Sequence, residues 1–260
     1  MIRNPEPWAF AVSILLFVGM IGLLEVGYRV AMWHAARDPE LAHEGISVIE
    51  AGVFALLGLL LAFQLAGGLS RLDARRQLVI NEASAISTAY SRIDLLPTAD
   101  QPEMRRLFRT YLDTKLGAYE KFPDRVAAEQ GMDRAKALEG ELWAKVVASS
   151  RQNPDREAEL LVLPTFSDLG TITTARKMAL YTHQPPTVFA LLIAMALLSA
   201  VLAGYAMAKR RRRSWLHLVI YPAVIALTVL VLLDLEYPRS GHVQLQATDD
   251  ALYSLRDSIR

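Results

Sequence analysis

The sequence predicts an all-α membrane protein with four transmembrane helices in two hairpins and a soluble helical bundle, or stalk, inserted between them. Hydrophobic residues make up 53% of the 260 residues, more than the about 45–50% typical of soluble domains. They concentrate in four windows of roughly 20 residues, the length of helix that crosses a bilayer. Residues 70–185 are instead charge-rich and amphipathic, as in a water-soluble protein.

The first hairpin is expected in residues 1–69, with spans at residues 8–28 and 48–69. Trp8 and Trp33 bracket the first span, and tryptophan commonly anchors a helix at the membrane interface. This span lacks the basic leader and small-residue cleavage site of a signal peptide. We therefore expect it to remain in the protein as a transmembrane helix.

The second hairpin is expected in residues 186–234, with spans at residues 187–207 and 215–233, followed by a C-terminal tail at 235–260. Two hairpins place the loops at 34–47 and 208–214 on one side of the membrane. The basic residues in these two short loops are Arg37, Lys209, Arg210, Arg211, Arg212 and Arg213. Because short loops carry most weight in the positive-inside rule, we expect this side to be cytoplasmic and the soluble segment to be extracytoplasmic.

The basic run at residues 209–213 has two interpretations. The first is a topology signal and nothing more. The alternative is a binding site for the headgroup of an anionic lipid. In both cases the lipid bilayer is the surrounding partner of the chain.

The soluble segment begins with a helical pattern, because apolar residues recur in steps of seven, four and three at Leu72, Val79, Ala83, Ile86, Tyr90 and Ile93. Such steps are typical of a packed helix with a coiled-coil-like seam. Only Gly67-Gly68 interrupts residues 48–96. The second span is therefore expected to continue out of the membrane as one helix about 70 Å long, and Pro97 is expected to end it.

Three further soluble helices are expected. The first covers residues 102–122 and the second residues 132–150. The third begins near residue 153, where Asn153 can cap a helix and Pro154 can occupy its first turn. Pro164 is expected to kink or split this helix. Since no window alternates apolar and polar residues at period two, no strand is expected.

Two separated patterns resemble an uncharacterised family of bacterial and plastid membrane proteins with a bestrophin-like domain. The first pattern is Arg71-x3-Arg75-Arg76, Glu82-Ala83, Thr88-Ala89-Tyr90-x-Arg92 and Leu96-Pro97, and the second is Asp234-Leu235-Glu236-x-Pro238-x-x-Gly241. The resemblance implies a location in a bacterial inner (plasma) membrane. Bestrophins, which lend the family its name, are pentameric chloride channels with four spans per subunit, and their large soluble region is cytoplasmic. That orientation is opposite to the one that the basic loops predict here.

Charged residues near the ends of the spans are candidates for function, because ionisable groups are rare in membranes. Glu25 and Arg29 lie one helical turn apart near the end of the first span, and Glu50 begins the second span. These residues either serve function, or Glu25 and Arg29 neutralise each other while Glu50 lies among headgroups.

A second group of charges follows the spans on the other side of the membrane. Asp234 and Glu236 end the fourth span, while Arg71, Arg75 and Arg76 follow the second. Carboxylates facing guanidinium groups form strong hydrogen bonds. We expect these residues to join the fourth span to the stalk helix, with ion coordination as the alternative.

Small residues form a face of the second span at Ala51, Ala55, Gly58 and Ala62, and a second stripe at Ala196, Ala200, Gly204 and Ala208 follows the third. Such stripes allow close helix packing in lipid. A pore lining has the same pattern. Gln64 is the one strongly polar side chain well inside the second span, and it either lines a wet path or bonds to a neighbouring helix.

Several function classes are excluded or unsupported. The chain has no cysteine, which excludes disulfides and thiolate chemistry. A net charge of +1 gives no reason to expect nucleic acid as a partner. The sequence has no phosphate-binding glycine loop, Gly-x-Ser-x-Gly or His-Glu-x-x-His motif, so we expect no enzyme activity and no cofactor.

The leading functional expectation is a homo-oligomeric membrane protein with channel or permeation activity. The alternative is a non-conducting sensor or scaffold whose soluble bundle binds a partner. The sensor lacks a cytoplasmic output domain, and the channel lacks a recognisable selectivity element.

Overall fold

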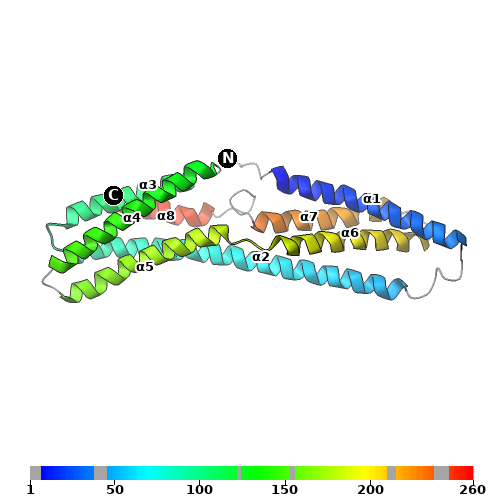
Figure 1. Ribbon diagram of the computed structural model, residues 1–260, viewed down its shortest axis with the longest axis horizontal. Coiled ribbons are helices and arrows are strands. Elements are labelled where there is room, and N and C mark those ends of the chain that lie inside the picture. The colour runs from blue at the N-terminus through cyan, green and yellow to red at the C-terminus, as the bar shows by residue number, and fades with distance from the viewer. Residues whose placement is uncertain are drawn as a thin grey trace. The chain divides into compact units, whose positions relative to one another are not determined.

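The computed structural model describes residues 7–37, 46–121, 124–152, 156–209, 215–236 and 246–259. Across these residues the chain is entirely helical and contains no strand, as expected (Figure 1). The chain divides into two compact units. The first comprises residues 1–72 and 183–243, and the second comprises residues 73–182 and 244–260.

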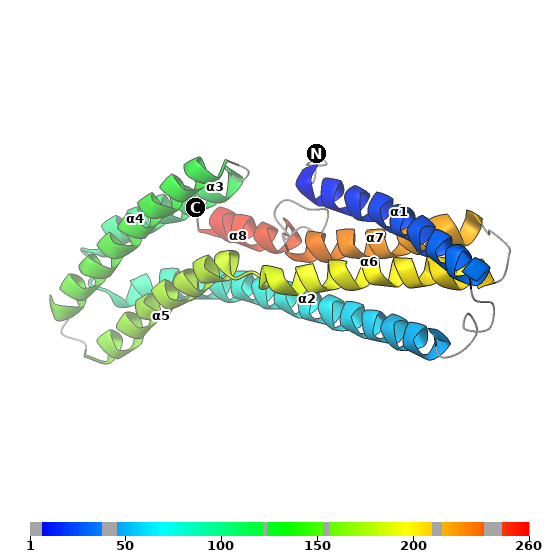
Figure 2. The ribbon, with the colours of Figure 1, turned by 45° about the vertical axis from the view of Figure 1, so that its right-hand side comes forward.

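The first unit contains the four membrane-spanning candidates, which are α1 (Pro7–Arg37), the first part of α2 (Ile46–Ser91), α6 (Pro186–Lys209) and α7 (Trp215–Glu236). Each of these helices is long and apolar enough to cross a membrane. α1 packs against both α6 and α7, and Figures 1 and 2 show the three helices side by side. Every span expected from the sequence therefore lies on an observed helix.

The backbones of α1 and α6 approach each other closely at two glycines. A side chain on Gly27 would collide with the carbonyl of Val201, and one on Gly204 would collide with the carbonyl of Leu24. Ala196 and Ala200 on the same stripe of α6 are fully buried. The small residues of the third span therefore serve helix packing, as in other membrane helix pairs.

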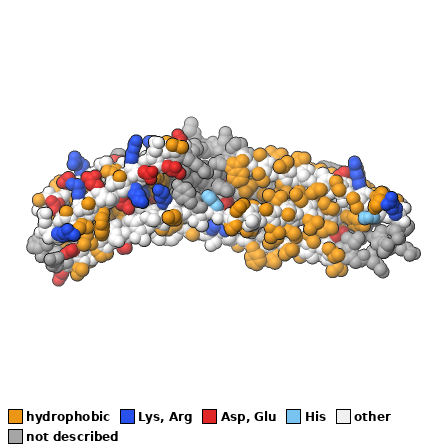
Figure 3. All heavy atoms as spheres, viewed as in Figure 1, with side chains coloured by type: hydrophobic (Ala, Val, Ile, Leu, Met, Phe, Trp, Pro, Cys, Tyr) orange, Lys and Arg blue, Asp and Glu red, His pale blue; other side chains and the backbone are white. Residues whose placement is uncertain are grey.

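Hydrophobic side chains cover most of the face of the spanning helices that Figure 3 shows. Large apolar residues such as Leu15 and Leu227 are 73% and 62% exposed. A water-soluble monomer rarely exposes so continuous an apolar surface. An apolar outer surface of this kind suits a helical bundle in lipid.

α2 is continuous over 46 residues, which corresponds to a length of about 69 Å. It passes through Gly67-Gly68 without interruption, as expected. The α-helix ends at Ser91 and the 3₁₀ turn η1 (Arg92–Leu95) follows. Leu96 then has an extended backbone, because proline disfavours helical backbone angles in the residue before it.

The second unit packs α3 (Gln101–Glu120), α4 (Arg125–Gln152) and α5 (Arg156–Tyr181) with the remainder of α2. α4 begins before the expected residue 132, because Asp124 caps it through the backbone N–H of Ala127 at 3.1 Å. α5 continues through Pro164 as one helix. In the turn around this proline, Arg92 donates a hydrogen bond to the carbonyl of Leu161 at 2.6 Å.

A helix in the C-terminal tail was not expected from the sequence. α8 (Gln246–Ser258) packs against α3 and buries Leu252, and Ile259, the residue after the helix, is also buried. The carbonyl of Ile259 accepts hydrogen bonds from the Tyr90 hydroxyl at 3.1 Å and from Nε of Arg109 at 3.0 Å. Residues 244–260 of the tail therefore belong to the second unit.

Aromatic rings form the centre of the second unit. Phe108 is fully buried and meets Tyr90, Tyr111 and Phe166 in edge-to-face contacts, with ring centroids 5.6–6.1 Å apart. Edge-to-face pairs contribute roughly 0.5–1.5 kcal/mol beyond the area they bury. This core fixes α2, α3 and α5 around the charged groups described below.

Candidate functional site

The small-residue face of α2 is exposed in the chain. All four of its residues, Ala51, Ala55, Gly58 and Ala62, are exposed. A Cβ on Gly58 would meet no atom of another segment within 4 Å in the described part of the chain. The comparable stripe on α6 is buried against α1. The small face of α2 is therefore available to other copies of the chain, to lipid or to water.

The other sides of α2 differ in character. Leu57 is buried among the other spans, and Phe54 meets the Tyr221 ring of α7 edge-on at 5.8 Å. Large apolar side chains, among them Leu56 and Phe63, form a separate exposed face. Gly52 lies six residues from Gly58, or about 120° around the helix at 3.6 residues per turn.

Gln64 lies away from the small-residue face. Its side-chain carbonyl accepts a hydrogen bond from the side-chain amide of Gln184, which lies two residues before the start of α6. Of the two roles open to Gln64, bonding to a neighbouring segment is the one that the structure describes. Through Gln184, this hydrogen bond connects Gln64 to a polar cluster around Glu236.

Glu236 is the centre of this cluster and only 2% of its side chain is exposed. One carboxylate oxygen pairs with Arg71, whose Nη2 lies at 2.9 Å and whose Nε lies at 3.1 Å. The other oxygen accepts the backbone N–H of Gln184 at 2.7 Å and lies 3.6 Å from Nδ1 of His183. Arg71 also donates to the Gln184 side chain at 3.0 Å.

The remaining expected members of this charge group have other surroundings. Arg75 is buried and donates to the carbonyls of Ala179 and Thr182 at 3.3 and 3.0 Å, at the C-terminal end of α5. Arginine is favourable there because the last carbonyls of a helix lack partners. Arg76 pairs with Asp73 on its own helix at 3.5 Å. The expected role of Asp234 stays a prediction.

At the other end of the spans, Glu25 and Arg29 form an ion pair at 2.8 Å across one turn of α1. Oε1 of Glu50 is buried and has no hydrogen-bond partner among the described residues. Residues 210–213 of the basic run and the side chain of Lys209 lie outside the described part of the chain.

A buried charge cluster in the second unit was not identified from the sequence. Glu82 on α2 is fully buried and pairs with Lys115 on α3 at 2.5 Å and with Arg176 on α5. The Lys115 amine also donates to the Tyr111 hydroxyl at 2.7 Å and to the Thr173 hydroxyl at 2.9 Å. These three bonds use all three donors of the ammonium group.

The cluster is held in its charged form. Burial alone would raise the pKa of Glu82, but the adjacent Lys115 and Arg176 lower it below its usual range. Burial alone would lower the pKa of Lys115, but its contacts with Tyr111 and Glu82 raise it. One carboxylate thus faces two buried cations. Lys115 also lines a neighbouring pocket, so the cluster contributes positive charge there.

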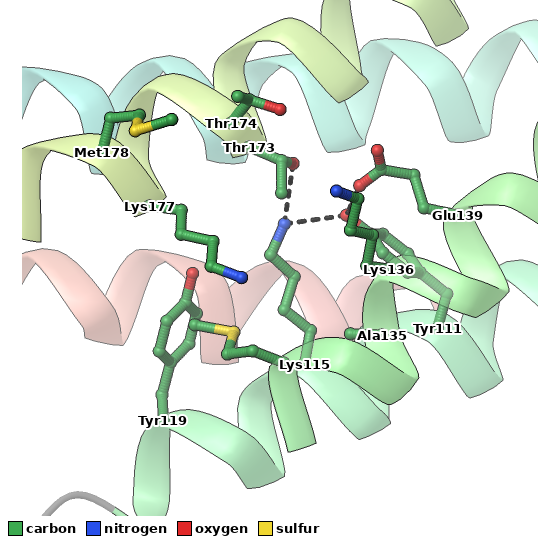
Figure 4. A pocket seen from close by; sticks show the side chains of 11 residues that line it. Tyr111, Lys115, Tyr119, Ala135, Lys136, Glu139, Thr173, Thr174, Lys177 and Met178 are labelled. Atoms are coloured by element: carbon green, nitrogen blue, oxygen red, sulfur yellow. Dashed lines mark hydrogen bonds between the residues drawn. The ribbon is translucent and has the colours of Figure 1, made fainter. Parts of the chain in front are cut away.

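The pocket has a volume of about 370 Å³ and lies between α3, α4 and α5 (Figure 4). Lys115 and Tyr111 border it, together with Lys136 and Glu139 from α4 and Lys177 from α5. Burial raises the pKa of Glu139 above its usual value. No group of three or more possible metal ligands occurs in the described ranges.

These residues could not be found by motif. Glu82 lies in the first of the two patterns that resemble the family. Its partners come from other helices far along the chain, so no spacing within the sequence predicts them. The available signal is the occurrence of Lys115 on an otherwise apolar helical face, between Leu112, Leu116 and Ala118. A charge at such a position requires a buried partner.

An all-helical chain with four helices of membrane-spanning length and composition is a multi-pass membrane protein. The chain belongs to the bestrophin-like domain family, which it matches across residues 9–249. This match confirms the resemblance seen in the sequence.

Solved structures with the same fold include bacterial bestrophin homologues. One variant of a homologue from Klebsiella pneumoniae is 11% identical, covers 96% of each chain and superposes with a TM-score of 0.69. Another variant is 14% identical, with 95% of this chain and 98% of that chain covered and a TM-score of 0.63. At these identities the likeness establishes the fold alone. No curated protein matches the sequence.

Proposed function

We propose that this protein is a homo-oligomeric ion channel in which the small-residue face of α2 lines the permeation path. The observation that carries the proposal is that Ala51, Ala55, Gly58 and Ala62 are exposed along one face of a membrane-spanning helix. Membership of the bestrophin-like family and the fold shared with bacterial bestrophin homologues support it.

The physical argument compares the two small-residue stripes of the first unit. Small residues in membrane helices serve close contacts, and the stripe on α6 makes such contacts with α1. The stripe on α2 has no corresponding contact at Gly58, although large apolar residues beside it provide a surface suited to lipid or to another subunit. Assembly of several copies around an axis would place the small face along a central path.

The proposed orientation follows from the basic residues. The run at residues 209–213 would face the cytoplasm, where it sets the topology and can contact anionic lipid headgroups. Residues 70–185 would then be extracytoplasmic, and the membrane would be a bacterial inner membrane. The two-hairpin arrangement of the spans belongs to this same proposal.

A second candidate function is a non-conducting sensor or scaffold whose second unit binds a partner. The pocket beside Lys115 is the observation that favours it. The two functions differ in one measurable property, because only the channel carries ion flux.

The test compares Gly58→Leu with Gly52→Leu in proteoliposomes. Both glycines lie on α2, and an added Cβ at either would meet no other described segment within 4 Å, but they face directions about 120° apart. Gly58→Leu is expected to abolish flux while the oligomer still assembles, and Gly52→Leu is expected to retain flux per assembled particle. If Gly58 packs against another subunit instead, overpacking would cost about 1–3 kcal/mol and the oligomer would be lost first.

A further inference from the structure

The pocket of the second unit has the size of a small-molecule site. Its volume of about 370 Å³ lies within the roughly 300–1,000 Å³ of typical ligand pockets. All of its lining residues belong to the second unit, and none belongs to the small-residue face of α2. A ligand in this pocket would therefore bind away from the proposed permeation path.

The charged lining favours an anion. Lys115, Lys136 and Lys177 come from three different helices, whereas Glu139 is the single carboxylate among the lining residues. Figure 4 shows the amino groups of Lys136 and Lys177 on opposite sides of the Lys115 amine. Lys115 has no spare donor, but its buried charge remains in place. Within the described ranges, the ion pair of Lys177 is a long contact of 3.6 Å with the exposed Asp133. Lys136 and Lys177 can therefore supply donors to a ligand.

The uncharged lining favours an apolar body. Met132 and Met178 line the pocket with Ala135 and the ring of Tyr119. Methionine side chains adapt to flat apolar groups and pack well against aromatic rings. The combination of cations and soft apolar surface matches a small amphiphilic anion better than an inorganic ion.

We propose that this pocket binds a small aromatic carboxylate, with the carboxylate between Lys136 and Lys177 and the ring against Met132 and Met178. The buried pair of Lys115 and Glu82 keeps the floor of the pocket polar and rigid. Glu139 opposes an anion when it is ionised, and burial reduces that ionisation by raising its pKa.

The test uses benzoate as the probe and the full-length protein in detergent. Saturation-transfer NMR measures binding of benzoate, of neutral benzamide and of cationic benzylamine. Benzoate is expected to bind, and the other two are expected to bind at least about tenfold more weakly, the effect of losing one charge-assisted hydrogen bond. Equal binding of all three probes would overturn the proposal, because it would reflect apolar partition alone.

Matched variants assign any binding to the pocket. Lys136→Met is expected to weaken benzoate binding about tenfold, while Arg134→Met, which removes the same charge from an exposed site on the same helix outside the lining, is expected to leave it unchanged. Unchanged binding by Lys136→Met would contradict the assignment.

A blocking pair on α5 completes the test. Thr174 lines the pocket and Thr171 does not, yet both are exposed and both donate to the carbonyl four residues earlier. Thr174→Phe is expected to abolish benzoate binding and Thr171→Phe to retain it, with the same circular dichroism for both. Retained binding by Thr174→Phe would overturn the proposal, and neither result bears on ion flux.

Discussion

Arg71 and Glu236 form an ion pair at 2.9 Å although 165 positions separate them in the chain. Arg71 follows the segment of α2 expected to cross the membrane, and Glu236 is the last residue of α7. The pair therefore ties together the corresponding ends of two spans, with Gln184 at the entry to α6 bonded to both partners.

Removing the negative charge of Glu236 is expected to destabilise the first unit. Glu236→Gln should lower the free energy of unfolding by about 2 kcal/mol, less than the about 3–5 kcal/mol for breaking a fully buried pair, because Arg71 is 31% exposed. Thermal unfolding followed by the fluorescence of the four tryptophans measures the loss. Adding Arg71→Met should restore part of it, whereas strictly additive losses would mean that the two residues are not coupled.

The buried cluster of the second unit should respond unequally to loss of its members. Glu82→Gln leaves two buried cations without a carboxylate, with an expected cost of about 3–5 kcal/mol. Lys115→Met leaves Glu82 paired with Arg176 and should cost less. The double variant should be more stable than Glu82→Gln alone. Equilibrium unfolding in urea tests this order, and a larger loss in Lys115→Met than in Glu82→Gln would contradict it.

Glu139 should destabilise the protein at neutral pH. Its pKa is raised in the folded state by burial, so the folded protein holds this proton more tightly than the unfolded chain. At a pH above the pKa of the folded state, Glu139 is ionised in both the folded and the unfolded protein, and its buried charge lowers the free energy of unfolding. At a pH below the pKa of the unfolded state, Glu139 is protonated in both states and this destabilisation disappears. Glu139→Gln should therefore raise Tm at pH 8 and have a smaller effect near pH 4. An equal gain at both pH values would exclude ionisation as the cause.

The sequence predicted the features that follow from periodicity and composition. The apolar windows became spanning helices, and the seam from Leu72 to Ile93 correctly indicated that α2 continues beyond the membrane segment. α8 was missed because 13 residues with few apolar positions give a weak signal. Its burial depends on the tertiary contact with α3.

The site was only partly predictable for the same reason. Gly58 is exposed and Gly204 is buried although both lie in stripes of small residues at helical spacing, so the packing distinguishes the two stripes. The partners of Glu82 and the pocket beside Lys115 depend on which faces of α3 and α5 meet. No local spacing encodes such contacts.

Orientation can be measured with single cysteines because the chain contains none. Glu141 is exposed on α4 and Ala36 is exposed at the end of α1, so both accept labels. On intact cells an impermeant maleimide should label Glu141→Cys and not Ala36→Cys. The reverse pattern would place the second unit in the cytoplasm.

The central claim, that the small-residue face of α2 lines an ion path, is tested most directly by modifying a single thiol during current recording. In planar bilayers the wild-type protein should carry current that a charged, water-soluble methanethiosulfonate leaves unchanged, since it has no cysteine. The same reagent should progressively block Gly58→Cys and should spare Phe63→Cys, whose side chain lies on the large apolar face. Unmodified current through Gly58→Cys, or no current from the wild-type protein at any voltage, would contradict the account.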